Sequence, residues 1–144
     1  MTVFPSEGMR AVVERMQNTS LEEFEGKVMD VVLEKNTFQD TESDQYHITM
    51  EPTTLTVKGK TGLLHEWLRL SPKTTQTAVP EGSVVERYLA QVELCLTEAR
   101  KLKTLDEALK LMKGKTFLFK KVKLGRSYEG RPAREVWTPI RLIK

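Results

Sequence analysis

The chain has 144 residues, of which 30% are charged, and its mean hydropathy is −0.41. These values are typical of one soluble domain with a core of its own, and no apolar run approaches the length that spans a membrane. The single cysteine, Cys95, excludes an internal disulfide bond and is consistent with a reducing compartment. The opening MTVFPSEGMR lacks the pattern of a secretory signal, so we expect a cytoplasmic protein without a membrane partner.

Charge is distributed unevenly along the chain. Residues 1–101 hold 11 Lys and Arg against 16 Asp and Glu, a net charge of −5. Residues 102–144 hold 12 Lys and Arg against 4 Asp and Glu, a net charge of +8. Such asymmetry is typical of a surface that faces a polyanion, so nucleic acid is the first candidate partner.

The first third of the chain is expected to hold a helix and two strands. Residues 9–17 place apolar side chains at helical spacing, so residues 1–24 are interpreted as an N-terminal helical extension. A β-branched run predicts a strand over Glu25–Lys35, and alternating polarity predicts a second strand over Gln45–Glu51. The polar segment between them, Asn36–Asp44, is expected to be a loop.

The middle of the chain is expected to change from strand to helix. Alternation predicts a third strand over Leu63–Leu70, and the Thr- and Pro-rich segment Ser71–Glu81 predicts a long loop. A capping box predicts a helix that starts at Ser83 and ends near residue 101. A second box at Thr104 predicts a shorter helix, with Gly114 as its C-terminal stop.

The segment Lys113–Arg134 contains eight basic residues and one acidic residue, with aromatic side chains between them. It includes a fourth predicted strand, Thr116–Leu124, and a basic turn, Gly125–Ala133. A fifth strand is expected over Glu135–Ile143, where Pro139 indicates a sheet edge, a bulge or a bend.

Alternate residues of the fourth predicted strand share a face. Phe117 and Phe119 would then lie with Lys121 and Lys123, an arrangement that can stack on bases and neutralise phosphates. The same pattern is also that of a half-buried strand whose Phe side chains belong to the core.

Both tryptophans fall on predicted strands. Trp67 shares a face with His65 and Arg69, so it is either an exposed stacking surface or a core residue, whereas Trp137 is expected in the core. Glu66 is the one charged residue on the apolar face of the third strand.

No pattern in the sequence specifies catalytic or metal chemistry. The two histidines and the cysteine lack the spacing of a zinc site. Gly59-Lys60-Thr61 and Gly114-Lys115-Thr116 lack the glycine that a phosphate-binding loop requires five residues earlier. We therefore expect a protein that is not an enzyme and that uses no cofactor and no metal.

The order of the predicted elements, three strands, a helical connection and two strands, resembles that of OB-fold single-stranded DNA-binding proteins. The segments that carry the resemblance are Gly26-Lys27-Val28, Tyr46-His47-Ile48, Trp67-Leu68-Arg69 and Gly114–Lys123. The resemblance implies a mainly β fold with helices (α+β), a five-stranded OB-like Greek-key barrel over residues 25–144. It also implies a helical insertion between strands three and four, and a binding groove across strands two and three.

We therefore expect a protein that binds single-stranded DNA, or less favourably RNA, by aromatic stacking and phosphate contacts. The predicted contacts are Tyr46, Trp67, Arg69, Lys115, Phe117, Phe119, Lys121, Lys123, Arg126, Tyr128, Arg131 and Arg134. The alternative is a protein–protein interaction module, including a homo-oligomer, that uses the acidic N-terminal part and the helices of residues 83–112.

Overall fold

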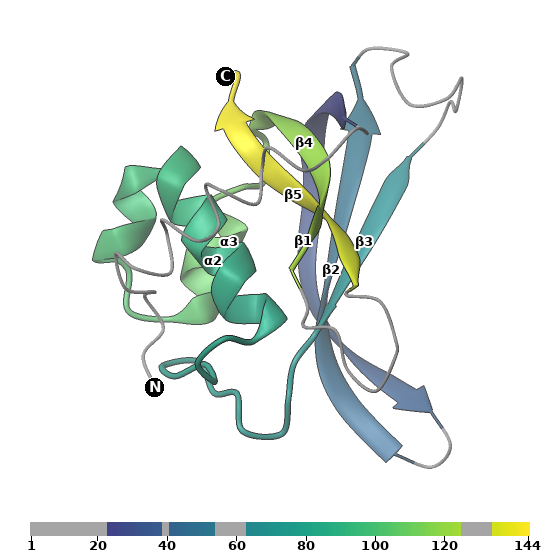
Figure 1. The fold of residues 1–144 in the computed structure, drawn as a ribbon, viewed down its shortest axis with the longest axis vertical. Coiled ribbons are helices and arrows are strands. Elements are labelled where there is room, and N and C mark those ends of the chain that lie inside the picture. The colour runs from purple at the N-terminus through teal and green to yellow at the C-terminus, as the bar shows by residue number, and fades with distance from the viewer. Residues whose placement is uncertain (1–22, 39–40, 54–62, 125–133) are drawn as a thin grey trace.

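The structure is a computed structural model, shown in Figure 1, that describes residues 23–38, 41–53, 63–124 and 134–144. Its elements are β1 (Glu23–Phe38), β2 (Thr41–Pro52), β3 (Leu64–Arg69), α2 (Val84–Cys95), the 3₁₀ helix η2 (Thr97–Lys101), α3 (Leu105–Lys110), β4 (Thr116–Lys123) and β5 (Glu135–Leu142).

Two predicted segments fall outside the described residues. The N-terminal helical extension, residues 1–24, lies outside them except for its last two positions, and the basic turn Gly125–Ala133 lies outside them entirely. Both stay predictions.

One antiparallel sheet of five strands forms the body of the described chain, in the order β3-β2-β1-β4-β5. Strand β1 lies at the centre because it pairs with β2 along most of its length and with β4 over its first residues. Figure 1 shows α2 and α3 together on one side of this sheet. The prediction of a mainly β fold with helices between the third and fourth strands is therefore confirmed.

The prediction of a loop over Asn36–Asp44 is wrong. β1 continues to Phe38 and β2 begins at Thr41, so the two strands form a long hairpin in which Asn36 lies opposite Ser43. The hairpin extends beyond the rest of the sheet at the bottom of Figure 1. Its residues are polar because this part of the hairpin has no core to cover, and the alternation that signals a half-buried strand is therefore missing.

Both predicted helix starts are confirmed. The Ser83 hydroxyl accepts a hydrogen bond from the backbone N–H of Glu86, and the Thr104 hydroxyl accepts one from the N–H of Glu107. The first helix is shorter than expected, because it ends at Cys95 and a 3₁₀ helix follows. Gly114 has a φ angle of +84°, the left-handed conformation that favours glycine just after a helix.

An aromatic cluster fills the core between β1, β4 and β5. The Phe24 ring lies 5.3 Å from the Phe119 ring and 4.8 Å from the Trp137 ring, measured between centroids. Strand β5 has buried side chains at four consecutive positions, 136–139, because α2 packs against the strand and Trp137 packs against Phe24. The prediction that Pro139 indicates a sheet edge or a bulge is confirmed. β5 lies at the edge of the sheet, and its register with β4 shifts beside Pro139.

Candidate functional site

Strand β3 presents a row of exposed side chains to solvent. His65, Trp67 and Arg69 are exposed, whereas Glu66 and Leu68 between them are buried. Trp67 keeps 42% of its surface exposed, which is unusual for so large an apolar ring. The predicted faces of β3 are confirmed, and Trp67 is the exposed tryptophan of the two.

Three aromatic rings lie together on this face, and we call His47, His65 and Trp67 the aromatic platform. His47 of β2 lies directly opposite Trp67 in the strand register. The Trp67 ring lies 4.9 Å from the His47 ring and 5.5 Å from the His65 ring, with interplanar angles of 22° and 19°. The Trp67 ring is therefore stacked with both histidine rings, which are tilted by 41° to each other, and the three rings form one aromatic cluster across β2 and β3. An exposed aromatic cluster of this kind can stack on bases.

Polar contacts hold the histidines of the aromatic platform in place. His47 Nε2 and His65 Nδ1 are joined by a hydrogen bond of 2.8 Å. On the other side of the same ring, His47 Nδ1 lies 3.6 Å from Glu34 Oε2, and Gln45 donates a 2.7 Å hydrogen bond to Glu34 Oε1. The platform is thus oriented by contacts from β1, β2 and β3.

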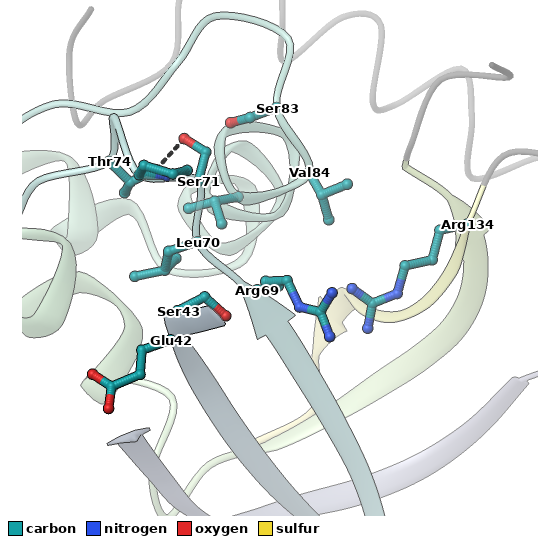
Figure 2. Close-up of a pocket in the computed structure, with 11 residues that line it drawn as sticks. Glu42, Ser43, Arg69, Leu70, Ser71, Thr74, Ser83, Val84 and Arg134 are labelled. Atoms are coloured by element: carbon teal, nitrogen blue, oxygen red, sulfur yellow. Dashed lines mark hydrogen bonds between the residues drawn. The ribbon is translucent and has the colours of Figure 1, made fainter. Parts of the chain in front are cut away.

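Two arginines, which we call the arginine pair, lie beside the platform. Arg69 ends β3 and Arg134 immediately precedes β5, so the pair comes from the two edges of the sheet. Figure 2 shows their guanidinium groups pointing toward one another. Within the described part of the chain the Arg69 guanidinium has no hydrogen bond or ion pair. Converging guanidinium groups form a site for an anion such as phosphate.

Glu66 joins the two edge strands and positions Arg134. Its carboxylate accepts hydrogen bonds from the backbone N–H of Trp137 at 2.6 Å and of Trp67 at 3.1 Å, and Arg134 Nη2 lies 3.1 Å from it. Arg134 also donates to the Trp67 carbonyl oxygen. Burial raises the pKa of Glu66, although these three donors act in the opposite direction. The charged residue on the apolar face of β3 is therefore the link between the two edges of the sheet.

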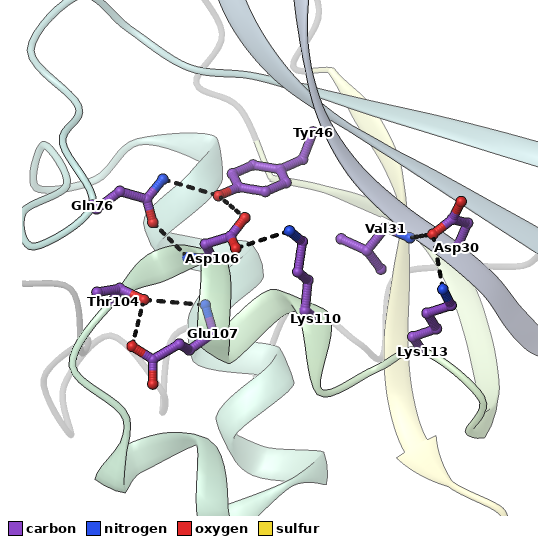
Figure 3. A network of polar contacts seen from close by, with 9 residues as sticks. All are labelled: Asp30, Val31, Tyr46, Gln76, Thr104, Asp106, Glu107, Lys110 and Lys113. Atoms are coloured by element: carbon purple, nitrogen blue, oxygen red, sulfur yellow. Dashed lines mark hydrogen bonds and ion pairs between the residues drawn. The ribbon is translucent and has the colours of Figure 1, made fainter.

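The prediction that Tyr46 contacts nucleic acid is wrong, because its side chain is fully buried on the inner face of β2. Its hydroxyl accepts a 3.0 Å hydrogen bond from Gln76 and donates one of 3.0 Å to Asp106 (Figure 3). Asp106 Oδ2 is also 2.9 Å from Lys110 Nζ. Burial raises the pKa of Tyr46 well above its usual range. Tyr46 therefore fastens α3 and the segment between β3 and α2 to the sheet.

The prediction that Phe117 and Phe119 contact nucleic acid is also wrong. Both side chains are fully buried, and their rings lie 5.7 Å apart. The core needs these inward-facing rings, so they have no exposed surface on which a base can stack. Of the two interpretations that the sequence left open for β4, the half-buried strand is the one observed.

The predicted lysines differ in their surroundings. Lys115 donates a 2.7 Å hydrogen bond to the Leu111 carbonyl oxygen beyond the end of α3, and Lys121 Nζ lies 5.3 Å from the centre of the Trp137 ring. Lys123, at the end of β4, is exposed. Only Lys123 therefore keeps the surroundings that the prediction assumed.

The predicted contacts in the segment before β5 lie outside the described residues and stay predictions; they are Arg126, Tyr128 and Arg131. Of the other predicted contacts the structure brings together Trp67, Arg69 and Arg134. His47 was not among the predicted contacts, although alternation places it on the outer face of β2. The missing information was the register, because only the pairing of β2 with β3 brings His47 opposite Trp67.

Other signs of function are few. No group of three or more His, Cys, Asp or Glu side chains in the described residues is arranged to hold a metal ion. None of the described helices combines the length and apolar character that crossing a membrane requires. Comparison with protein-family models, with curated proteins and with solved structures found no match. The aromatic platform and the arginine pair are therefore the basis for a functional assignment.

Proposed function

We propose that this protein binds single-stranded nucleic acid, DNA in preference to RNA, on the outer face of β2 and β3, without catalysing a reaction. The observation that carries the proposal is the half-exposed Trp67 ring, flanked by two histidine rings and followed on the same face by Arg69. Every base has an apolar face that can stack on such a ring, and an adjacent guanidinium can meet the phosphate that follows.

The proposed fold is an OB-like Greek-key barrel. The order β3-β2-β1-β4 supports it, because a Greek key places its fourth strand beside the first. The contacts of Glu66 with Trp137 and Arg134 support it further, since they draw β5 toward β3, the strand at the opposite edge of the sheet. In such a barrel the aromatic platform and the arginine pair would lie along one continuous groove.

The direct test is binding of a labelled 20-nucleotide single strand to the full chain at low salt, followed by fluorescence anisotropy. Trp67→Ala is expected to weaken binding by about 5- to 150-fold, which corresponds to about 1–3 kcal/mol for one stacked base. Met29→Ala is the matched control, because Met29 is 41% exposed on β1 and is not part of the platform. A duplex and an RNA strand of the same sequence measure the preference.

The proposal fails if the unmodified chain does not bind any of these strands at low salt. It also fails if Trp67→Ala and Met29→Ala have the same effect on affinity, because binding would then not involve the platform. Circular dichroism of each variant checks that a loss of affinity is not a loss of fold.

The alternative, a protein docking surface on the helices, receives less support. Eight of the twelve residues of α2 are buried. A helix covered on most of its circumference leaves little surface for a second protein. The nucleic-acid proposal is therefore the one that the exposed side chains favour.

A further inference from the structure

A cavity adjoins the arginine pair, and Trp67 is not among the residues that line it. It has a volume of about 620 Å³ and lies between the end of β3, the segment that follows it and the start of α2 (Figure 2). Its apolar lining comes from Leu70, Pro72, Val84 and Val85. This volume is in the range of sites that hold small organic ligands, and the apolar lining would favour a flat, weakly polar group.

The arginine pair lies between this apolar cavity and the aromatic platform. Arg69 and Arg134 line the cavity, and they also line a smaller one of about 250 Å³ with Trp67 and Gln45. An anion held between the two guanidinium groups would therefore have an aromatic surface on one side and an apolar cavity on the other. A nucleotide chain has this alternation, because each phosphate lies between two bases.

Polar groups lie across the cavity from the arginine pair. Figure 2 shows Glu42 away from the guanidinium groups, with Ser43 between it and Arg69. The hydroxyls of Ser71 and Thr74, which also line the cavity, are 3.2 Å apart. A carboxylate there can accept a hydrogen bond from the exocyclic amino group of a base such as cytosine. Lys35 Nζ lies 3.8 Å from Glu42 Oε2, so the apolar lining, and not the charge of this carboxylate, makes the cavity suit a base better than more backbone.

We propose that this cavity receives one base of the bound strand, with the adjoining phosphate held by Arg69 and Arg134 and the next base stacked on Trp67. The inference rests on the proposed function and makes it more specific. It makes the nucleotide, a base together with its phosphate, the unit that the site recognises. If only the charge of the arginine pair mattered, the recognised ligand would instead be an inorganic anion.

The test is a titration of the ¹⁵N-labelled full chain with deoxycytidine monophosphate, followed by backbone amide NMR. Ribose 5-phosphate and inorganic phosphate are the matched probes without a base. We expect deoxycytidine monophosphate to shift the amides of Leu70, Val84 and Val85, and the two other probes to shift only amides near Arg69 and Arg134. Equal shifts of the cavity amides with all three probes, or no shift of them with the nucleotide, would overturn the inference.

A variant that fills the cavity tests the same inference on a longer strand. Val84 is half-buried at the cavity wall, so Val84→Phe is expected to block the cavity and to lower the affinity for the 20-nucleotide strand about tenfold, the loss of one base contact. Val84→Ala, which leaves the cavity open, is the control and is expected to bind normally.

If Val84→Phe folds and binds normally, the cavity is not used, although nucleic-acid binding still stands. If Val84→Phe does not fold, the NMR titration decides. Absence of any strand binding by the unmodified chain would instead refute the proposed function itself.

Discussion

On β3, Trp67 and Arg69 point away from the core, whereas on β4 Phe117 and Phe119 are fully buried. The cations differ in the same way. Lys120 of β4 pairs with Glu23 of β1 at 3.7 Å, but the Arg69 guanidinium of β3 has no such partner among the described residues. The two strands carry similar side chains, yet the aromatic side chain of β3 is exposed whereas those of β4 are buried in the core.

This difference shows that a high density of basic and aromatic residues is a poor guide to a binding surface. Strand β4 belongs to the most basic part of the chain, but its aromatic side chains supply the core. Strand β3 carries one arginine and one tryptophan in an acidic part of the chain, and both are exposed. Exposure and the absence of a partner within the fold therefore say more about function than the count of charges.

The largest expected effect is on the free energy of unfolding, which should fall far more when an aromatic side chain is removed from β4 than when one is removed from β3. Phe119→Ala removes a fully buried ring that contacts Phe24, so it should lower the free energy of unfolding by about 3–5 kcal/mol. Trp67→Ala removes a half-exposed ring and should change it far less. Urea denaturation of both variants measures the difference. A greater loss of stability for Trp67→Ala would show that the comparison between β3 and β4 is wrong.

The next effect concerns Glu66, which joins the edge strands. In Glu66→Gln the amide nitrogen cannot accept a hydrogen bond, so one of the buried donors loses its acceptor, at a cost of about 1–3 kcal/mol. Glu135→Gln is the control, because Glu135 is an exposed carboxylate at the start of β5 and its substitution should change stability by about 0.5 kcal/mol at most.

Glu66 also predicts a pH dependence. Burial raises the pKa of Glu66 in the folded state above its ordinary value of 4.5, so the folded state binds a proton more tightly than the unfolded state. The stability that Glu66 contributes is therefore largest below about pH 4 and falls as pH rises through the folded pKa. The cost of Glu66→Gln should shrink over the same range in urea denaturation. A cost that grows with pH would contradict the raised pKa.

Regular alternation made part of the fold and site predictable. β3 follows a strict period of two, so the sequence alone predicted that Trp67 and Arg69 share a face opposite to that of Leu68. It did not decide whether Trp67 is exposed or in the core. The faces of β4 could not be predicted, because its buried pattern changes phase between Phe119 and Val122 and the sheet register shifts nearby.

The contacts that complete the site are long-range and could not be predicted from local patterns. The arginine pair forms only because Arg134 approaches β3, which is 67 residues away along the chain. The apolar cavity likewise depends on how α2 packs beside the end of β3. A single sequence predicts the type of an element far better than its neighbours in space.

A smaller expected effect is on the salt dependence of binding affinity, which should change when a cation is removed from β3 but not when Lys120 is removed from β4. If Arg69 contacts a phosphate, Arg69→Ala should reduce the slope of log affinity against log salt by about 0.7 for a single strand. Lys120→Ala should leave the slope unchanged, because Lys120 pairs with Glu23. Anisotropy titrations at several salt concentrations measure both slopes. Equal changes in the two slopes would mean that binding follows general positive charge and not the site on β3.

The smallest effect tests whether the basic residues of β4 are committed to partners within the fold. Lys120 and Glu23 lie directly opposite each other in the register of β4 and β1, and their charged groups are 3.7 Å apart. Because both side chains keep some exposure to water, the coupling energy in a double-mutant cycle of Lys120→Ala and Glu23→Ala should be only about 0.2–1 kcal/mol. A cycle of Arg69→Ala with Glu23→Ala should give no coupling. Thermal or urea unfolding of the variants measures both, and added salt should weaken the first coupling.

If Lys120 shows no coupling to Glu23 while Lys120→Ala lowers the salt slope of binding, the interface extends onto β4 and the division between the two strands fails.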